Sequence, residues 1–376
     1  MEIYEEGKAR IKFNSQSFLN PKAQLSRDLS VAFVKYKTKI NPKATVIDTT
    51  SATGIRGIRY YKEGGAKEIC MLEINNSAFK DLKGNMNYNK MNKDSNVRYY
   101  NTSIQEFANS SVRESFDIID LDPFGSAAPN LTDIMKLARD KSSLMITATD
   151  VAVLCGAHYK ACLKTYFAQP LHNALCHEVG IRILLGYIAR IASLFNFGIE
   201  PEISISYLHY VRLFLKLDHG AAAAVKNYES IGYALYCKAC GNFALNSPIP
   251  HSLNCNVCGH EYSIAGPLWV GRIQDKTVIN GVKEVMSQDK VKNDEMTFMS
   301  NLSSELDTPL YYSIPALTKM MNVESVSYDR LKEELQSQGH SISKTHMNKE
   351  SIKTDAGISE VKAAILKVLK SRNMIN

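Results

Sequence analysis

TVIDTTSATGIR, residues 45–56, carries an apolar strand into a turn of small residues and then into the start of a helix. Four similar apolar runs follow, and helical stretches fill the intervals between them. Such alternation is typical of a parallel sheet with helices on both faces, an α/β fold. The expected strands span residues 45–48, 68–72, 97–100, 116–120 and 143–147, and the expected helices residues 54–62, 76–88 and 131–140.

The turn after the first expected strand predicts a ligand site. Asp48 ends the strand, and small residues lead to Gly54 and Arg56 at the helix start. Small side chains let backbone N–H groups approach a ligand, and the helix dipole favours a negative group there. The segment lacks G-x-G-x-x-G, so a pyrophosphate-binding fingerprint is not supported. S-adenosyl-L-methionine, which has a carboxylate and no phosphate, suits this single-glycine turn.

Polar residues also follow the next two expected strands. Glu73 stands 25 positions after Asp48, where an acid holds the ribose hydroxyls in dinucleotide-binding folds. Asn101 follows the third strand and is placed to reach an adenine edge. Each residue has an ordinary alternative, because Glu73 suits a surface acid and Asn101 a turn. Their positions after successive strands favour a nucleoside cofactor.

DIIDLDPFG, residues 117–125, ends the fourth expected strand with an acid, a proline and an aromatic ring. An exocyclic amine of a base is a poor nucleophile because its lone pair is delocalised, and a carboxylate that holds its hydrogens can aim that lone pair. Asp122 supplies the carboxylate, Pro123 a rigid carbonyl acceptor and Phe124 a stacking surface for an extruded base. The alternative is an Asp-Pro-x-Gly turn in which Asp120 or Asp122 caps the next segment. Beside the cofactor residues, the pattern favours methyl transfer to a planar amine.

Two C-x-x-C pairs, each followed by glycine, predict a zinc ribbon. Such pairs occur on knuckle turns, and four thiolates close a tetrahedral structural site. The alternatives are a redox pair and an iron–sulfur site. The predicted zinc ligands are Cys237, Cys240, Cys255 and Cys258. Structural roles, as buried thiols or satisfied polar groups, are expected for Cys70, Cys155, Cys162, Cys176, His158, His172, His177 and Glu178.

The chain has a modest excess of basic residues. Its 376 residues include 45 Lys and Arg against 38 Asp and Glu, a net charge of +7. This balance is compatible with a polyanionic partner without requiring one. The excess gathers near both ends, where phosphate contacts and solvated lysines are both reasonable interpretations. The lysines placed to contact phosphates are Lys35, Lys37, Lys39, Lys344, Lys349 and Lys353.

The N-terminal sequence and the apolar segments favour a cytoplasmic protein. MEIYEEGKAR is charged from its second residue, so no secretory signal is expected. The most apolar long stretch, residues 179–199, contains Arg182 and Arg190, which argues against a membrane span. Cysteines in such a compartment are expected as thiols or metal ligands. No obligate protein partner is evident.

Seven segments carry a family resemblance: SATGIRGIRY, DLDPFGSAAP, TATDVAVLCG, CHEVGIRILLGYIAR, LHYVRLFLKL, GPLWVG and SISKTHMNKESIKT. Together they resemble the tRNA (guanine-26, N2)-dimethyltransferase family over most of the chain. The resemblance implies a Rossmann-like class I methyltransferase sheet, S-adenosyl-L-methionine as donor, tRNA as partner and two methyl transfers to N2 of one guanine.

The resemblance also implies roles for individual residues. Arg27 in LSRD and Arg56 in SATGIR correspond to arginines that bind the cofactor carboxylate or line the pocket. Glu73 corresponds to the ribose ligand, and Asn101 and Thr102 to residues beside the adenine.

Asp122 corresponds to the catalytic acid, and three positions depart from the family pattern. The family more often has Asn where Ser26 stands, Asp where Glu73 stands and Pro where Ala127 stands. Glu73 keeps a carboxylate for the ribose, whereas the change at Ser26 leaves the placement of Arg27 open.

We expect three parts: a methyltransferase domain over residues 1–232, a zinc-ribbon insert over 233–272 and an α+β C-terminal tRNA-binding domain over 273–376. In the last part, helices and the basic hairpin of residues 341–354 suit a winged-helix-like module. Two other functions remain open: an amino methyltransferase acting on DNA, and a zinc-stabilised RNA-binding protein without catalysis.

Overall fold

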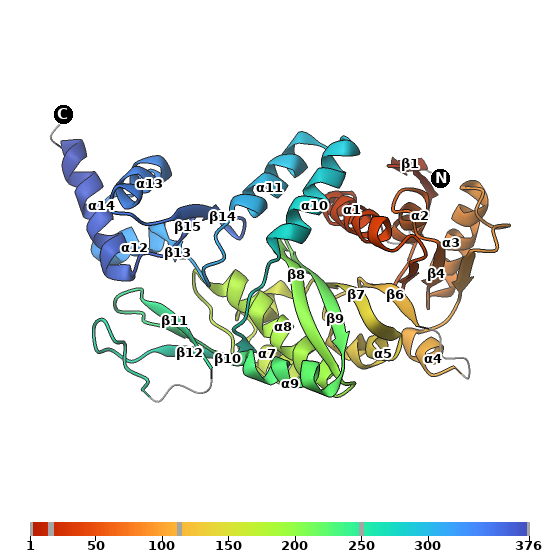
Figure 1. The fold of residues 1–376 in the computed structure, drawn as a ribbon, viewed down its shortest axis with the longest axis horizontal. Helices are drawn as coiled ribbons and strands as arrows, with labels where there is room; N and C mark the ends of the chain where they lie inside the picture. Colours follow the sequence, from red (N-terminus) through yellow and green to blue (C-terminus); the bar gives the residue numbers. More distant parts are fainter. Residues whose placement is uncertain (1–2, 14–18, 111–114, 248–251, 374–376) are drawn as a thin grey trace.

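A seven-stranded mixed sheet forms the centre of the protein (Figure 1). The computed structural model describes residues 3–13, 19–110, 115–247 and 252–373. The strands lie in the order β5-β4-β3-β6-β7-β9-β8, and β9 runs antiparallel to both of its neighbours. Their bounds are β3 Thr45–Asp48, β4 Glu68–Leu72, β5 Val97–Tyr100, β6 Phe116–Leu121, β7 Ala138–Ala148, β8 Phe197–Tyr207 and β9 Tyr210–His219. The expected α/β fold is confirmed.

Helices cover both faces of the sheet because its strands are apolar on both sides. Along β4, Ile69 and Met71 enter one core, whereas Cys70 and Leu72 enter the other. The first core includes side chains of α1 (Gln24–Ile40), α2 (Ile55–Lys62), α3 (Asn76–Tyr88), α10 (Lys276–Gln288) and α11 (Asn293–Ser304). The second core includes side chains of α4 (Ile104–Ala108), α5 (Leu131–Lys136), α6 (Val151–Leu154), α7 (Tyr159–Tyr166) and α8 (Cys176–Ser193).

The reversal of strand order places a ligand edge beside β3. The chain moves outward from β3 through β4 to β5, and then returns to add β6 on the other side of β3. Ligands of open α/β sheets bind outside the carboxyl ends of the strands at such a reversal. We call this region, where β3, β4, β5 and β6 end, the carboxyl edge.

Two secondary-structure predictions need correction. The helix expected over residues 131–140 ends at Lys136, because β7 begins at Ala138 and pairs there with β6. The β-branched and aromatic residues at 203–217 predict one strand-like run, and the structure divides this run between two long strands, β8 and β9, which pair across a turn at residues 208–209.

Two small sheets lie beside the main one (Figure 1). The first has the order β11-β10-β12, with β10 Ile231–Tyr236, β11 Phe243–Asn246 and β12 Ser263–Trp269. The second joins β13 (Tyr312–Ser313) to the expected basic hairpin, which is confirmed as β14 (Ile342–Thr345) and β15 (Asn348–Thr354). Around it lie α12 (Ile314–Met321), α13 (Tyr328–Ser337) and α14 (Ile358–Asn373). The remaining elements are β1 (Ile3–Glu6), β2 (Ala9–Lys12) and α9 (Ala221–Glu229).

Helices α10 and α11 pack against the N-terminal half of the chain. Val282 and Met286 of α10, and Met299 and Leu302 of α11, share a core with α1. The C-terminal hairpin, in contrast, contributes Ile342 and Ile352 to a separate small core that also includes Leu331. None of the described helices is both long enough and apolar enough to cross a membrane.

Candidate active site

The turn after β3 brings backbone N–H groups and a buried acid to the carboxyl edge. Asp48 is fully buried, and its carboxylate accepts hydrogen bonds from the backbone of Gly57 at 3.2 Å and Thr50 at 3.4 Å. Burial, reinforced by the nearby charge of Asp120, raises the pKa of Asp48 to about 7. Gly54 precedes α2 with a φ of +82°, a conformation that favours glycine.

Glu73, Asn101 and Thr102 follow β4 and β5 and meet the same edge. The Glu73 carboxylate accepts from the backbone N–H of Ala52 at 2.8 Å, which ties the end of β4 to the turn after β3. The Asn101 amide donates to the Glu73 carbonyl at 2.7 Å. Thr102 instead donates to Glu106 at 3.0 Å, beside the capping box of α4. The structure thus brings Glu73 and Asn101 together and turns the Thr102 hydroxyl toward a helix start.

Asp122 follows β6 and is held by an arginine from α2. The Nε and Nη2 atoms of Arg56 lie 2.8 and 2.7 Å from Oδ2 of Asp122. Burial alone would raise the pKa of Asp122, but the guanidinium groups of Arg56 and Arg212 outweigh that effect and lower it. The side chain stays 27% exposed. Asp122 is therefore an ionised hydrogen-bond acceptor that a ligand at the carboxyl edge can reach.

The loop after Asp122 is fixed by the end of β7. The backbone groups of Gly125 and Thr149 meet at 2.8 Å, and the Gly125 N–H also donates to the Thr149 hydroxyl at 2.8 Å. The Tyr166 hydroxyl lies 2.7 Å from that of Ser126 and 2.8 Å from the Asp150 carboxylate. These contacts leave the Phe124 ring 76% exposed at the carboxyl edge.

A second arginine behind this site was not predicted from the sequence. Arg212 of β9 is fully buried and lies 2.7 Å from the Asp120 carboxylate. It donates to Thr147 at 2.7 Å and to Ser30 of α1 at 2.9 Å. No local pattern marks Arg212, because a charged residue in an otherwise apolar strand acquires its partners only when β9 pairs with β7.

Arg27 pairs with an acid of β1. Its guanidinium makes a bidentate pair with Glu6 of β1 at 2.6 and 2.7 Å and donates to the Asn20 carbonyl at 2.9 Å. Ser26, the preceding residue, contacts Arg56 at 3.0 Å. The departure from the family pattern at residue 26 therefore bears directly on Arg56 as well as on the placement of Arg27.

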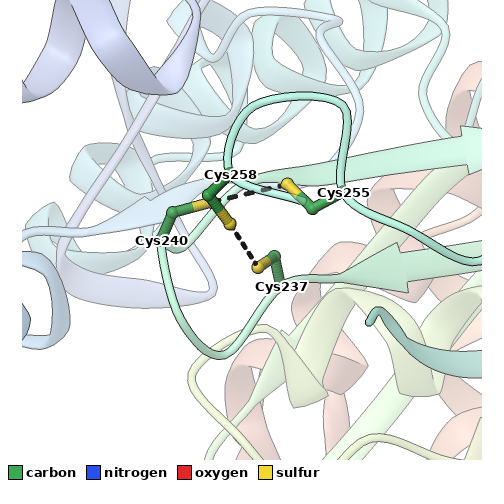
Figure 2. Close-up of side chains that lie close together, drawn as sticks. All are labelled: Cys237, Cys240, Cys255 and Cys258. Carbon is green, nitrogen blue, oxygen red and sulfur yellow. Dashed lines mark hydrogen bonds between the residues drawn. The ribbon is translucent and has the colours of Figure 1, made fainter. Parts of the chain in front are cut away.

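The four predicted zinc ligands lie together (Figure 2). The Sγ atoms of Cys237 and Cys258 are 3.4 Å apart, those of Cys240 and Cys255 are 3.5 Å apart, and all four lie within 4.8 Å of one another. Each pair sits on a tight turn closed by a 2.8 Å backbone bond. The glycines after the pairs, Gly241 and Gly259, have φ values of +82° and +75°. Four thiols at this spacing fit a tetrahedral zinc ion.

The lysines expected to contact phosphate differ in exposure. Lys353 is 2% exposed and lies 3.1 Å from Glu178 and 3.3 Å from Glu305, so its predicted phosphate contact is wrong. Lys35 pairs with an acid after α10, and Lys37 with an acid of β8. The exposed members of the set are Lys39, Lys344 and Lys349.

Comparisons with known proteins agree with this geometry. The model of the family described as N2,N2-dimethylguanosine tRNA methyltransferase matches residues 1–366. A relative from Pyrococcus abyssi named tRNA (guanine(26)-N(2))-dimethyltransferase is 35% identical, with 95% of this chain and 97% of the relative covered. One of the same name from Methanosphaera stadtmanae is 31% identical, with 98% of each covered. A solved complex of Trm1 from Pyrococcus horikoshii with S-adenosyl-L-methionine is similar with a TM-score of 0.85 and 31% identity, covering 97% of this chain and 100% of that one. The chain belongs to the N2,N2-dimethylguanosine tRNA methyltransferase family.

Proposed function

We propose that this protein transfers methyl groups from S-adenosyl-L-methionine to the exocyclic N2 of guanine 26 in tRNA, forming N2,N2-dimethylguanosine. The family match over nearly the whole chain supports the reaction. The observation that carries its chemistry is the position of Asp122, an ionised and partly exposed acid beside the turn after β3. The strand order, with antiparallel β9 inserted before β8, supports the class I methyltransferase architecture.

The cofactor is assigned to the carboxyl edge between β3 and β5. When bound there, S-adenosyl-L-methionine supplies the methyl group. Glu73 offers its carboxylate to the ribose hydroxyls, and Asn101 and Thr102 lie on the adenine side. Asp48 and Gly54 shape the turn whose N–H groups face the amino-acid part of the cofactor.

The two arginines take different parts in this proposal. Arg56 already binds Asp122 at 2.7 Å, so it lies where the methyl donor and the accepting amine have to meet. Arg27 is bound to Glu6, and its contribution is to fix β1 against α1 beside the cofactor turn. The carboxylate of the cofactor is thus assigned to Arg56 in preference to Arg27.

Asp122, Pro123 and Phe124 are assigned to the guanine. The Asp122 carboxylate and the Pro123 carbonyl accept the two amine hydrogens, which draws the N2 lone pair out of conjugation. Formation of the bond from N2 to the methyl carbon would break the carbon–sulfur bond of the donor and release S-adenosylhomocysteine, and N2 would lose one proton to the Asp122 carboxylate. A base-derived ammonium ion is strongly acidic, so a carboxylate with a lowered pKa still accepts that proton. The exposed ring of Phe124 supports the base by stacking.

The small domains are assigned to zinc and RNA. Cys237, Cys240, Cys255 and Cys258 would hold one structural zinc ion, because four thiolates leave no open position for catalysis. The insert has a core of few buried residues around these cysteines, so metal binding would supply folding free energy that its own core lacks. The C-terminal hairpin, with Lys344 and Lys349 exposed, is assigned to phosphate contacts.

Nucleoside mass spectrometry tests the reaction and its acid together. Unmodified tRNA with guanine or adenine at position 26 is incubated with the protein and S-adenosyl-L-methionine. We expect N2,N2-dimethylguanosine only from the guanine-26 transcript, and none from the Asp122→Ala variant. Asp117→Ala is the matched control, because Asp117 lies on the same strand at the opposite end of the sheet and pairs with Arg139. Methylation of adenine or cytosine in DNA would identify another amino methyltransferase, and cofactor-independent tRNA binding without methylation would identify a binding protein.

A further inference from the structure

A second cluster of metal-ligating side chains lies outside the four-cysteine insert. It joins Cys155, at the end of α6, to Cys176 and His177, the first two residues of α8. One ligand atom from each of these residues lies within 4.8 Å of the other two. The sequence predicts structural roles for all three, as buried thiols and a satisfied imidazole.

The distances within the cluster resemble those around a tetrahedral ion. The Cys155 Sγ and His177 Nδ1 atoms are 3.7 Å apart. A zinc ion with a Zn–S bond of about 2.3 Å and a Zn–N bond of about 2.0 Å separates its sulfur and nitrogen ligands by about 3.5 Å. The hydroxyl of Ser206, on β8, lies 3.3 Å from the same Nδ1 atom. Ligand atoms at the end of α6 and the start of α8 therefore converge on one point, and Ser206 contacts one of them from β8.

The cluster is partly accessible from solvent. Cys155 is 9% exposed, whereas Cys176 and His177 are partly exposed and leave a route for an ion. The Cys155 thiol lies 3.5 Å from the Cys176 carbonyl and 3.7 Å from the His177 ring, and it also makes a hydrogen bond to the Cys176 thiol, so the three side chains already face one another.

We propose that Cys155, Cys176 and His177 bind a second divalent metal ion of the zinc type. Binding exchanges two thiol protons for two metal–sulfur bonds and adds one bond to Nδ1, and water fills the fourth position. The ligand atoms are relatively soft, and thiolate and imidazole ligands bind zinc in preference to magnesium or calcium. The inference is independent of the proposed methyl transfer.

Such an ion would stabilise the wall behind the candidate active site. Helix α6 begins directly after Asp150, whose carboxylate is bound to Tyr166 beside the loop of Ser126. An ion between Cys155 and Cys176 would fix the far end of α6 to the start of α8. The ion would hold α6 and α8 in place and would not take part in methyl transfer.

Metal analysis of the full chain and its variants tests the proposal. We expect about two zinc ions per chain in the purified protein, one in each cluster. Cys155→Ser and Cys176→Ser should each lower the content to about one. Cys162→Ser is the matched control, since Cys162 is a buried thiol of α7 outside both clusters, and it should retain both ions. Equal metal content in all three variants and the unaltered protein would overturn the second site.

X-ray absorption on the unaltered zinc-loaded protein keeps the test independent of any folding defect. Two sites predict on average about three sulfur and one nitrogen or oxygen ligands per zinc, whereas the four-cysteine site alone predicts sulfur only. A sulfur-only shell would contradict the proposal. Alkylation under denaturing, non-reducing conditions supplies a second check. Failure of Cys155 and Cys176 to react would show that they form a disulfide, and this outcome would also overturn the metal site.

Discussion

Arg56 lies 2.7 Å from the carboxylate of Asp122, and the two side chains differ sharply in exposure. The arginine side chain is 8% exposed and the aspartate side chain 27%. Ser26 and Ser30 thus hold the Arg56 guanidinium in the core. The guanidinium in turn fixes the Asp122 carboxylate at the carboxyl edge. A carboxylate in this setting stays ionised without being free to move.

Replacing Arg56 should change how methyl transfer depends on pH. Arg56→Gln removes the positive charge that lowers the pKa of Asp122, and burial then raises it. We expect the acid limb of the kcat/KM profile to move to higher pH, in addition to a loss of rate. The measurement is single-turnover methylation of tRNA from pH 5 to 9. An acid limb at the same pH in variant and unaltered protein would contradict the electrostatic role of Arg56.

The Tyr166 hydroxyl should support both stability and turnover. Tyr166→Phe leaves the Asp150 carboxylate and the Ser126 hydroxyl without their shared partner, at a cost of about 1–3 kcal/mol in the free energy of unfolding. Because Ser126 belongs to the loop after Asp122, kcat should fall as well. Thermal unfolding and kcat measure the two effects. Tyr187→Phe is the control, because the Tyr187 ring packs edge-on against Tyr166.

A buried carboxyl pair between α1 and α11 should make stability fall at alkaline pH. Burial and the neighbouring Asp28 raise the pKa of Glu295 to about 8. The folded state therefore keeps a proton that the unfolded state loses near its ordinary pKa, and stability falls as pH rises from about 4.5 to about 8. Glu295→Gln should nearly match the unaltered protein at pH 4.5. At pH 8.5 it should be more stable by on the order of 5 kcal/mol, because the folded and unfolded pKa values differ by about 3.5 units at about 1.4 kcal/mol each. Denaturant unfolding at both pH values decides this.

Lys353 and Lys349 lie on the same strand, β15, and replacing them should affect different properties of the protein, stability in one case and tRNA binding in the other. Lys353→Ala removes a buried cation that Glu178 and Glu305 share, and the two acids keep only Arg182 and His346 as partners, which costs about 1–3 kcal/mol. Lys349→Ala changes an exposed side chain, so stability should be retained and tRNA affinity should fall in a salt-dependent manner. Thermal unfolding and tRNA binding at two salt concentrations separate the two effects. Loss of stability in Lys349→Ala would contradict this difference in burial.

Removing one ligand of the four-cysteine cluster should unfold the insert locally. Cys237→Ser breaks the tetrahedral set, and the small core around Leu235 and Tyr262 cannot compensate. We expect the loss of about one metal ion per chain and new protease cleavage within residues 233–272. Metal analysis and limited proteolysis provide the readouts. Unchanged cleavage after metal loss would show that the insert folds without its ion.

Local patterns predicted the parallel part of the sheet well. The bounds expected for β3, β4 and β5 are those observed, because apolar runs of four or five residues end there at Asp48, Glu73 and Asn101. The same runs marked the carboxyl edge and, with it, most of the candidate site residues. Periodicity and turn composition carry this information within a few neighbouring residues.

Long-range charge pairing could not be predicted in the same way. The sequence predicts a cofactor-binding role for Arg27, but it gives no sign of the contact with Glu6, 21 residues away. Lys353 looked exposed in a basic hairpin, although its partner Glu178 lies 175 positions earlier in the sequence. Arg212 went unnoticed within an apolar strand. In each case the deciding partner comes from another element, so only the tertiary fold assigns the side chain.

The burial of Lys353 also fixes the distance between the C-terminal hairpin and the candidate active site. Glu178 lies in the first turn of α8, whose start adjoins α6, and α6 follows the strand that fixes the loop of Asp122. The separation between the exposed hairpin lysines and Asp122 is therefore built into the protein before any RNA binds. A tRNA that reaches both has to match that span with its own fold. Adding or removing one base pair between its two contact regions should abolish methylation even when the target guanine and its neighbours are retained.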